Sequence, residues 1–173
     1  FGFTPIMFAI SKDNYALVRY LVTHGAQINY QVSYKNRRKG LTPLMLASLE
    51  GNLKIVKLLV LNGAKINTRV RDWFSGELLY HQSALFYAAF KGNTDVVKYL
   101  IEKGADINIK VITENILMAA VQGSHYETVK YILTVGININ EKTKYAREES
   151  VLDMARSRKD VKMIRLLKKA GAK

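Results

Sequence analysis

Mostly apolar side chains recur along the chain as two adjacent pairs, with the second pair four residues after the first. Positions i, i+1, i+4 and i+5 form one stripe along an α-helix. The pairs are Leu17-Val18 with Leu21-Val22, Ile55-Val56 with Leu59-Val60, Val96-Val97 with Leu100-Ile101, and Thr128-Val129 with Ile132-Leu133. A glycine follows each stripe, where a left-handed residue can end a helix. The pattern predicts a series of similar helices, each buried on one side.

A shorter motif precedes each stripe and predicts a second helix in every unit. It reaches an alanine five residues after its first residue: Thr4 to Ala9, Thr42 to Ala47, Ser83 to Ala88, Glu114 to Ala119, and Ser150 to Ala155. The hydroxyls of Thr4 and Thr42 can cap the first turn of a helix. Pro5 and Pro43 then stand at the first helical position, where a missing N–H does no harm. Each unit therefore consists of two helices joined by a tight turn, such as Gly51-Asn52.

Thr-Pro-Leu, alanine, Gly-Asn, the apolar pairs and Gly-Ala-x-Ile-Asn follow one another in a fixed order. Together they resemble the ankyrin repeat, and the resemblance covers nearly the whole chain. It implies an all-α fold, a solenoid of helix-turn-helix units with β-hairpin loops, in a single domain over residues 1–173. Five units are expected, at about residues 2–33, 40–70, 81–111, 112–143 and 148–173.

Several positions depart from the family's pattern. The motif histidine, which in the family ties neighbouring repeats together, is replaced by Met7, Met45 and Phe86. The turn at Gly123-Ser124-His125-Tyr126 is expected to hold one extra residue. Lys168 replaces an apolar residue in the last helix, so residues 150–173 are interpreted as a C-terminal cap. The first helix is apolar nearly all round, and we therefore expect further repeats or a cap before Phe1.

Two units are longer than the family's period. The motifs start at residues 4, 42, 83, 114 and 150, which gives gaps of 38, 41, 31 and 36 residues. The extra residues fall in the hairpin loops, here called fingers, and insertions in repeat proteins often lie on the binding face. Aromatic and arginine side chains are enriched at interface hot spots, and the fingers supply seven candidates: Tyr34, Arg37 and Arg38 in the first, and Arg71, Trp73, Phe74 and Tyr80 in the second.

Each finger also has a purely structural interpretation. Trp73 and Phe74 could pack against the neighbouring finger as a small local core. The basic run Lys35–Lys39 could be a solvated hairpin tip that blocks edge pairing. A hot spot at Trp73 predicts that a Trp73→Ala change weakens partner binding by about 2 kcal/mol or more.

By resemblance to the family, the first helices and the fingers line a concave groove. The residues just before each helix-helix turn are expected to face this groove. The candidates are Leu49 and Glu50, Phe90 and Lys91, and Val121 and Gln122. Leu49, Phe90 and Val121 would form an apolar track, because exposed apolar patches usually mark interaction sites. Alternatively, these three side chains pack beneath the fingers.

The formal net charge of +13 favours an acidic partner. The leading hypothesis is a monomeric, non-catalytic module that binds a protein with acidic character through the groove and fingers. Basic residues interleaved with aromatic ones leave nucleic-acid binding as an alternative. A third possibility is that these repeats position the remainder of a larger enzyme or channel.

Catalytic and cofactor-binding motifs are absent from the sequence. Its three histidines, His24, His81 and His125, stand in no triad or zinc-binding pattern. The chain has no cysteine, which rules out disulfides and cysteine-based zinc sites and suits a reducing cytoplasm. The sequence therefore predicts neither enzymatic activity nor a bound metal or cofactor.

Overall fold

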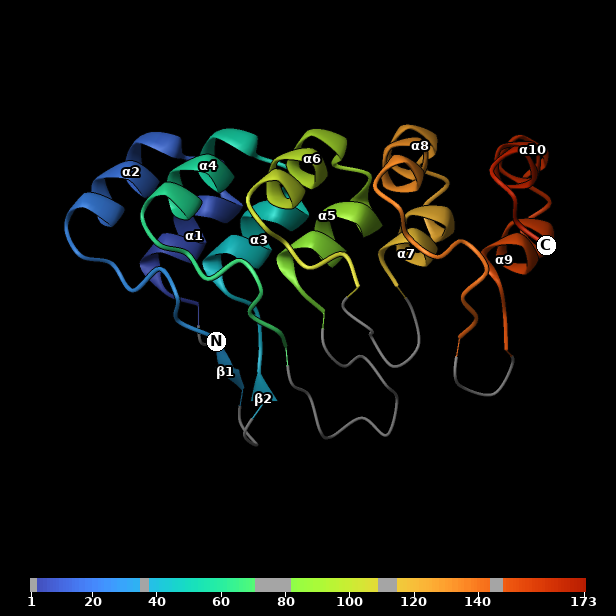
Figure 1. Ribbon diagram of the computed structural model, residues 1–173. Coiled ribbons are helices and arrows are strands. Elements are labelled where there is room, and N and C mark those ends of the chain that lie inside the picture. The colour runs from blue at the N-terminus through green and yellow to red at the C-terminus, as the bar shows by residue number, and fades with distance from the viewer. Residues whose placement is uncertain (1–2, 35–37, 71–81, 109–114, 144–147) are drawn as a thin grey trace.

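The computed structural model describes residues 3–34, 38–70, 82–108, 115–143 and 148–173. In this part of the chain, ten α-helices follow one another in five pairs (Figure 1). The pairs are α1 (Pro5–Ser11) with α2 (Tyr15–Thr23), α3 (Pro43–Glu50) with α4 (Leu53–Leu61), α5 (Ala84–Lys91) with α6 (Thr94–Glu102), α7 (Ile116–Gln122) with α8 (Tyr126–Thr134), and α9 (Val151–Ser157) with α10 (Val161–Lys169). The expected all-α repeat solenoid is confirmed.

The helices form two rows. The first helix of each pair lies in one row and the second in the other, and we call them the inner and outer helices (Figure 1). One alanine at an equivalent position of each inner helix is at most 1% exposed, so neighbouring inner helices can pack closely. These alanines are Ala9, Ala47, Ala88, Ala120 and Ala155. No described helix is long and apolar enough to cross a lipid bilayer.

Side-chain caps start most inner helices, as the sequence predicts. Thr42 Oγ1 accepts a hydrogen bond from Met45 N at 3.2 Å, and Asn115 Oδ1 accepts one from Met118 N at 2.9 Å. Met45 Sδ accepts from Thr42 N at 3.4 Å, so this methionine itself contributes to the cap. The expectation for Thr4 was wrong, because its buried hydroxyl caps no backbone N–H and has no partner among the described residues.

The cap at Asn115 corrects the expected start of the fourth unit, which was placed at Glu114. With starts at residues 4, 42, 83, 115 and 150, the gaps become 38, 41, 32 and 35 residues. The outer helix is then capped ten residues later in every unit, so the fourth turn holds no extra residue. The prediction failed because Ala119 and Ala120 both fit the alanine position of the motif.

The residue before each outer helix cap is left-handed in all five units. It is glycine in two of them, with φ +81° at Gly51 and +74° at Gly92. Asp13, Ser124 and Lys159 take the same conformation with φ between 52° and 55°. This conformation costs a residue with a Cβ more than it costs glycine. Three units nevertheless adopt it without a glycine, so the turn keeps the same conformation in every unit although its residue varies.

Candidate partner-binding face

The corrected register places one residue of every inner helix at the same point, seven residues after its cap. This residue is Leu49 in the second unit, Phe90 in the third and Gln122 in the fourth. Leu49 and Gln122 are half-buried, while Phe90 is 40% exposed. The next residues in the second and third units, Glu50 and Lys91, are exposed. We call the surface formed by these five residues the inner-helix face.

Val121 does not belong to this face, and its expected place in an apolar track was wrong. It is 1% exposed and stands six residues after the cap, the position held by Ser48 and Ala89, which are both 0% exposed. The error follows directly from starting the unit at Glu114 instead of Asn115. The apolar part of the inner-helix face therefore consists of Leu49 and Phe90, with the polar Gln122 beside them.

Phe90 is supported by a cluster of aromatic side chains on α5. Its ring stacks on Phe86 with 6.4 Å between ring centroids, and Phe86 meets Tyr87 edge-on at 6.2 Å. Lys91 Nζ lies 5.8 Å from the Phe90 ring centroid. Phe86 is buried against Ala119 of the next unit, so the cluster is fixed from below while Phe90 keeps part of its ring in solvent.

Two further aromatic residues, which were not predicted from the sequence, lie one helical turn earlier. Phe8 of α1 is 58% exposed, and Tyr87 of α5 is half-buried. Both stand four residues after their caps, on the side of the helix that also carries the position seven residues after the cap. The repeat register could have indicated these two residues, because it fixes the helical face of every residue once the caps are known.

The bases of the fingers are held by main-chain hydrogen bonds. Strands β1 (Ser33–Tyr34) and β2 (Arg38–Lys39) pair antiparallel, with Tyr34 opposite Arg38. Below them, Val32 is 1% exposed, and its N–H donates to Leu41 O at 3.1 Å. The base of the second finger is closed by Val70 N, which donates to Gln82 O at 3.0 Å. The remaining finger candidates, Arg37, Arg71, Trp73, Phe74 and Tyr80, lie outside the described residues.

Most of the chain matches the model of a known protein family. The family model described as "Ankyrin repeats (3 copies)" matches residues 1–70 and 74–143. The protein is a member of the ankyrin repeat family. Each matched range spans 70 residues, so the match covers 140 of 173. A search of the curated proteins gave no match.

Family membership gives the general role of the chain. Ankyrin repeats are generally protein–protein interaction modules, and the family is typically non-catalytic. The helix pair α9–α10 lies beyond the matched ranges and continues the same two rows of helices (Figure 1).

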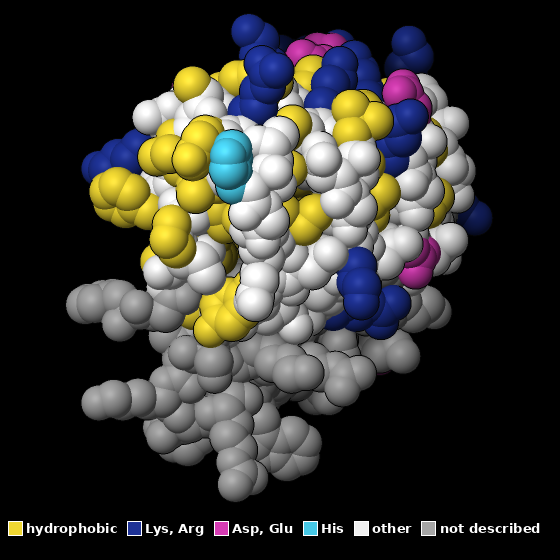
Figure 2. Space-filling view, turned by 90° about the vertical axis from the view of Figure 1, so that its left-hand side faces the viewer, with side chains coloured by type: hydrophobic (Ala, Val, Ile, Leu, Met, Phe, Trp, Pro, Cys, Tyr) yellow, Lys and Arg dark blue, Asp and Glu magenta, His cyan; other side chains and the backbone are white. Residues whose placement is uncertain are grey.

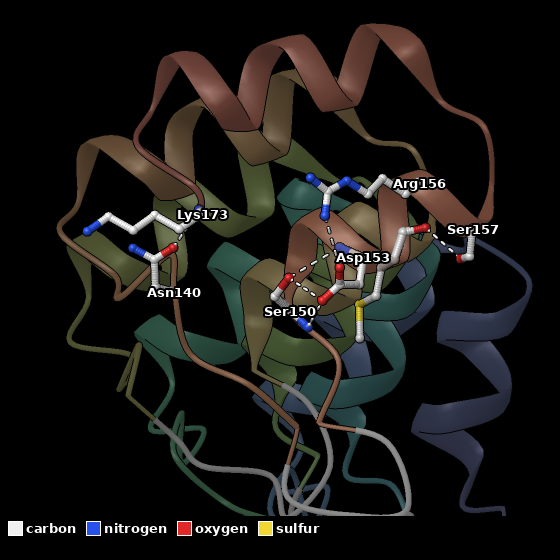
Figure 3. A network of polar contacts seen from close by, with 7 residues as sticks. Asn140, Ser150, Asp153, Arg156, Ser157 and Lys173 are labelled. Carbon is white, nitrogen blue, oxygen red and sulfur yellow. Dashed lines mark hydrogen bonds and ion pairs between the residues drawn. The ribbon is translucent and has the colours of Figure 1, made fainter.

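Asparagines of the Ile-Asn motif join successive ankyrin units below the outer helices. Asn67 Nδ2 donates to Gly104 O at 3.1 Å, and Asn67 Oδ1 accepts from Asp106 N at 3.0 Å. One side chain thus satisfies a carbonyl and an N–H of the next unit. The same two bonds join Asn29 to Gly63 and Lys65, and Asn140 to Gly171 and Lys173. Figure 3 shows the bond between Asn140 and Lys173.

Residues that cap the outer helices make a second set of links, and these hold the inner-helix face. His125 Nε2 lies 3.0 Å from Phe90 O, and a carbonyl can only accept, so this nitrogen carries the proton. Asn93 Nδ2 donates to Ser48 O at 2.8 Å and to Leu49 O at 3.1 Å. The backbone at Leu49 and Phe90 is therefore fixed by the unit that follows each of them.

The carboxylates with shifted pKa values have structural partners. A hydrogen bond from Ser150 Oγ lowers the pKa of Asp153, and an ion pair at 3.2 Å to Arg156 adds to it (Figure 3). Burial raises the pKa of Asp160, but hydrogen bonds donated by Met163 N, Tyr126 Oη and Ser124 Oγ outweigh this effect and leave the pKa below its ordinary value. Both carboxylates cap helices. Among the described residues, no cluster of acidic or histidine side chains could hold a metal ion.

Charge is distributed unequally between the two rows of helices. The inner helices carry two cations and two anions, Lys91, Arg156, Glu50 and Asp153, and are neutral overall. The outer helices carry nine Lys or Arg against three Asp or Glu, a net charge of +6. Figure 2 shows dark blue side chains along the top of the molecule, where Figure 1 places the outer helices.

Proposed function

We propose that this ankyrin domain binds a segment of a partner protein across its inner-helix face and fingers, without catalysing a reaction. The observation that carries the proposal is Phe90, which is 40% exposed although Phe86 stacks on its ring and His125 holds its backbone carbonyl. A large apolar side chain fixed in this way can be buried by a partner at little cost in conformational entropy. Leu49 beside it extends the apolar contact.

The charges that flank this apolar contact bear on the nature of the partner. Because the inner helices are neutral overall, they give no general preference for an acidic segment. Glu50 and Lys91 instead offer one charge of each sign beside Leu49 and Phe90. An acidic partner finds its cations in the first finger, where Lys35, Arg37, Arg38 and Lys39 contribute four positive charges. We therefore propose a partner segment with an apolar anchor over Phe90 and acidic residues toward the first finger.

The test compares two exposed aromatic residues on opposite rows of helices. Phe90→Ala removes the proposed anchor, and Tyr20→Ala removes a ring that is 57% exposed on the outer helix α2. Each variant and the wild-type chain is immobilised and used to capture proteins from a lysate, with the captured proteins quantified by mass spectrometry. A hot spot is worth about 2 kcal/mol or more, roughly 30-fold in affinity.

We expect a specific protein that is captured by the wild type and by Tyr20→Ala, and lost from Phe90→Ala. Circular dichroism must show that both variants are folded. A captured set that Phe90→Ala leaves unchanged would remove the inner-helix face from the binding site. Equal losses in both variants would contradict the assignment to one face.

A further inference from the structure

The outer helices share a basic position that the inner-helix face does not use. Five residues after the cap, every outer helix carries Arg or Lys, and all five side chains are exposed: Arg19, Lys57, Lys98, Lys130 and Arg165. Packed helices lie about 8–10 Å apart, so four steps give a row of roughly 30–40 Å. These five residues belong to α2, α4, α6, α8 and α10, which lie in one row along the whole stack of described helices (Figure 1).

The charge in this row is only partly compensated. Lys98 Nζ lies 3.8 Å from Asp95 Oδ1, and Lys130 Nζ lies 2.7 Å from Glu127 Oε1. The excess is concentrated at α10, which carries four cations and no acid. Its exposed Lys162, Arg165, Lys168 and Lys169 form no ion pair with any described carboxylate.

Exposed apolar side chains lie on the same helices as these cations. Tyr20 of α2 is 57% exposed, Leu61 of α4 is 77% exposed, and Val161 of α10 is 58% exposed. Cations at the water interface with apolar side chains between them are the combination by which surface helices bind anionic lipid. A partner that takes all of these groups at once must be broad and negatively charged.

We propose that the outer-helix surface docks on an anionic lipid membrane, with α10 supplying most of the electrostatic attraction and Leu61 entering the headgroup region. The site is separate from the inner-helix face, so a protein bound there could be held at the membrane at the same time. No helix needs to insert, because Met163 and Leu167 of α10 are already in the core, each 0% exposed.

Single-stranded nucleic acid fits this surface less well. It binds by stacking bases on open aromatic rings, and two tyrosine rings of the outer helices are already covered by lysine. Lys57 Nζ lies 5.6 Å from the Tyr99 ring centroid, and Lys98 Nζ lies 5.8 Å from that of Tyr131. The exposed aliphatic side chains of Leu61 and Val161 likewise offer nothing to phosphates.

The first experiment measures sedimentation of the full chain with vesicles of phosphatidylcholine alone or of phosphatidylcholine with phosphatidylserine. The triple variant R165Q/K168Q/K169Q removes three cations that have no partner among the described residues, so the fold should be preserved. The control K12Q/K65Q/K91Q removes three exposed cations that lie outside the outer helices. Each variant lowers the net charge by three, from +13 to +10.

We expect binding to the anionic vesicles only, weakened by added salt. Each Lys or Arg near such a surface contributes roughly fivefold to binding, so the α10 variant should lose on the order of a hundredfold and the control much less. Equal losses in both variants would show that net charge alone drives binding, and would overturn the proposal. So would a failure of the wild type to bind, or tighter binding to a single-stranded RNA that the α10 substitutions abolish.

A second experiment tests the orientation on the membrane. Because the chain has no cysteine, a single Leu61→Cys or Ser157→Cys substitution can be labelled uniquely with an environment-sensitive fluorophore. Ser157 is exposed at the end of the inner helix α9 (Figure 3). On addition of anionic vesicles, we expect a blue shift at position 61 and none at position 157. A shift at position 157 alone would place the inner-helix face on the membrane and refute the assignment. Neither experiment depends on the protein partner of the inner-helix face.

Discussion

A substitution at Gly92 tests whether the link from His125 to Phe90 stabilises the stack. Gly92 has φ +74°, and an added Cβ would lie 2.3–2.8 Å from atoms of the His125 ring. Gly104 provides a matched control, because it has φ +86° and an added Cβ there would meet nothing within 4 Å. Alanine at either position suffers the same backbone strain, but only alanine at Gly92 must also displace the histidine ring.

The two contributions can be estimated separately. A left-handed conformation costs a non-glycine residue about 1–2 kcal/mol, and this is the full expected effect of Gly104→Ala. Displacing His125 also breaks its hydrogen bond to Phe90 O, which measures 3.0 Å, and a net hydrogen bond is worth about 0.5–1.5 kcal/mol. Gly92→Ala should therefore lower the free energy of unfolding by about 1.5–3.5 kcal/mol.

Urea unfolding followed by far-ultraviolet circular dichroism measures both values, provided that the slope of the unfolding free energy against urea concentration is the same in the variants and the wild type. A double-mutant cycle with His125→Ala isolates the ring contact. In that background, Gly92→Ala should cost no more than Gly104→Ala, because the obstructing ring is gone. If Gly92→Ala and Gly104→Ala have equal effects in the wild-type background, the link from His125 contributes nothing measurable and the reasoning is refuted.

Three further predictions concern caps and links between units. Thr42→Ala should cost about 1 kcal/mol in urea unfolding because it removes a helix cap, whereas Thr4→Val should cost nothing, since the buried Thr4 hydroxyl has no partner among the described residues. Asn67→Ala removes two bonds to the next unit and should cost about 1–2 kcal/mol in the same assay. Because the pKa of Asp160 is lowered in the folded protein, its contribution to stability is present above the ordinary pKa of an aspartate and is lost as the pH falls through the folded-state pKa. The stability difference between wild type and Asp160→Asn should therefore shrink in acid unfolding curves recorded below that pH, and a constant difference would contradict the linkage.

The helices and their order could be predicted from the sequence because both depend on local signals. The stripe Ile55-Val56 with Leu59-Val60 becomes the buried side of α4, and Thr42-Pro43 starts α3 as expected. The start of the fourth unit could not be fixed in this way, because two adjacent alanines fit the same motif position. Only the hydrogen bond from Met118 N to the side chain of Asn115 decides between them.

One error of register changed the expected site. Moving the start by one residue turned Val121 from a groove residue into a core residue, and left Gln122 at the position shared with Leu49 and Phe90. The sequence left open whether Phe90 is exposed or packed beneath the fingers, because its exposure depends on Phe86 filling the space beneath it. The links from Asn93 and His125 also join residues that are distant in sequence, and no periodicity in the sequence indicates them.

The placement of charge changes what the net charge of the chain implies. Inner helices are packed on both sides by their neighbours, so few of their positions can hold a charged side chain. Outer helices have a solvent-facing side that accepts either sign, yet nine of their twelve charged residues are basic. Packing therefore explains why charge is on the outside but not why it is positive. We therefore propose that shape and the fingers select the partner of the inner-helix face, whereas the positive charge of the outer helices is available to a second, anionic surface.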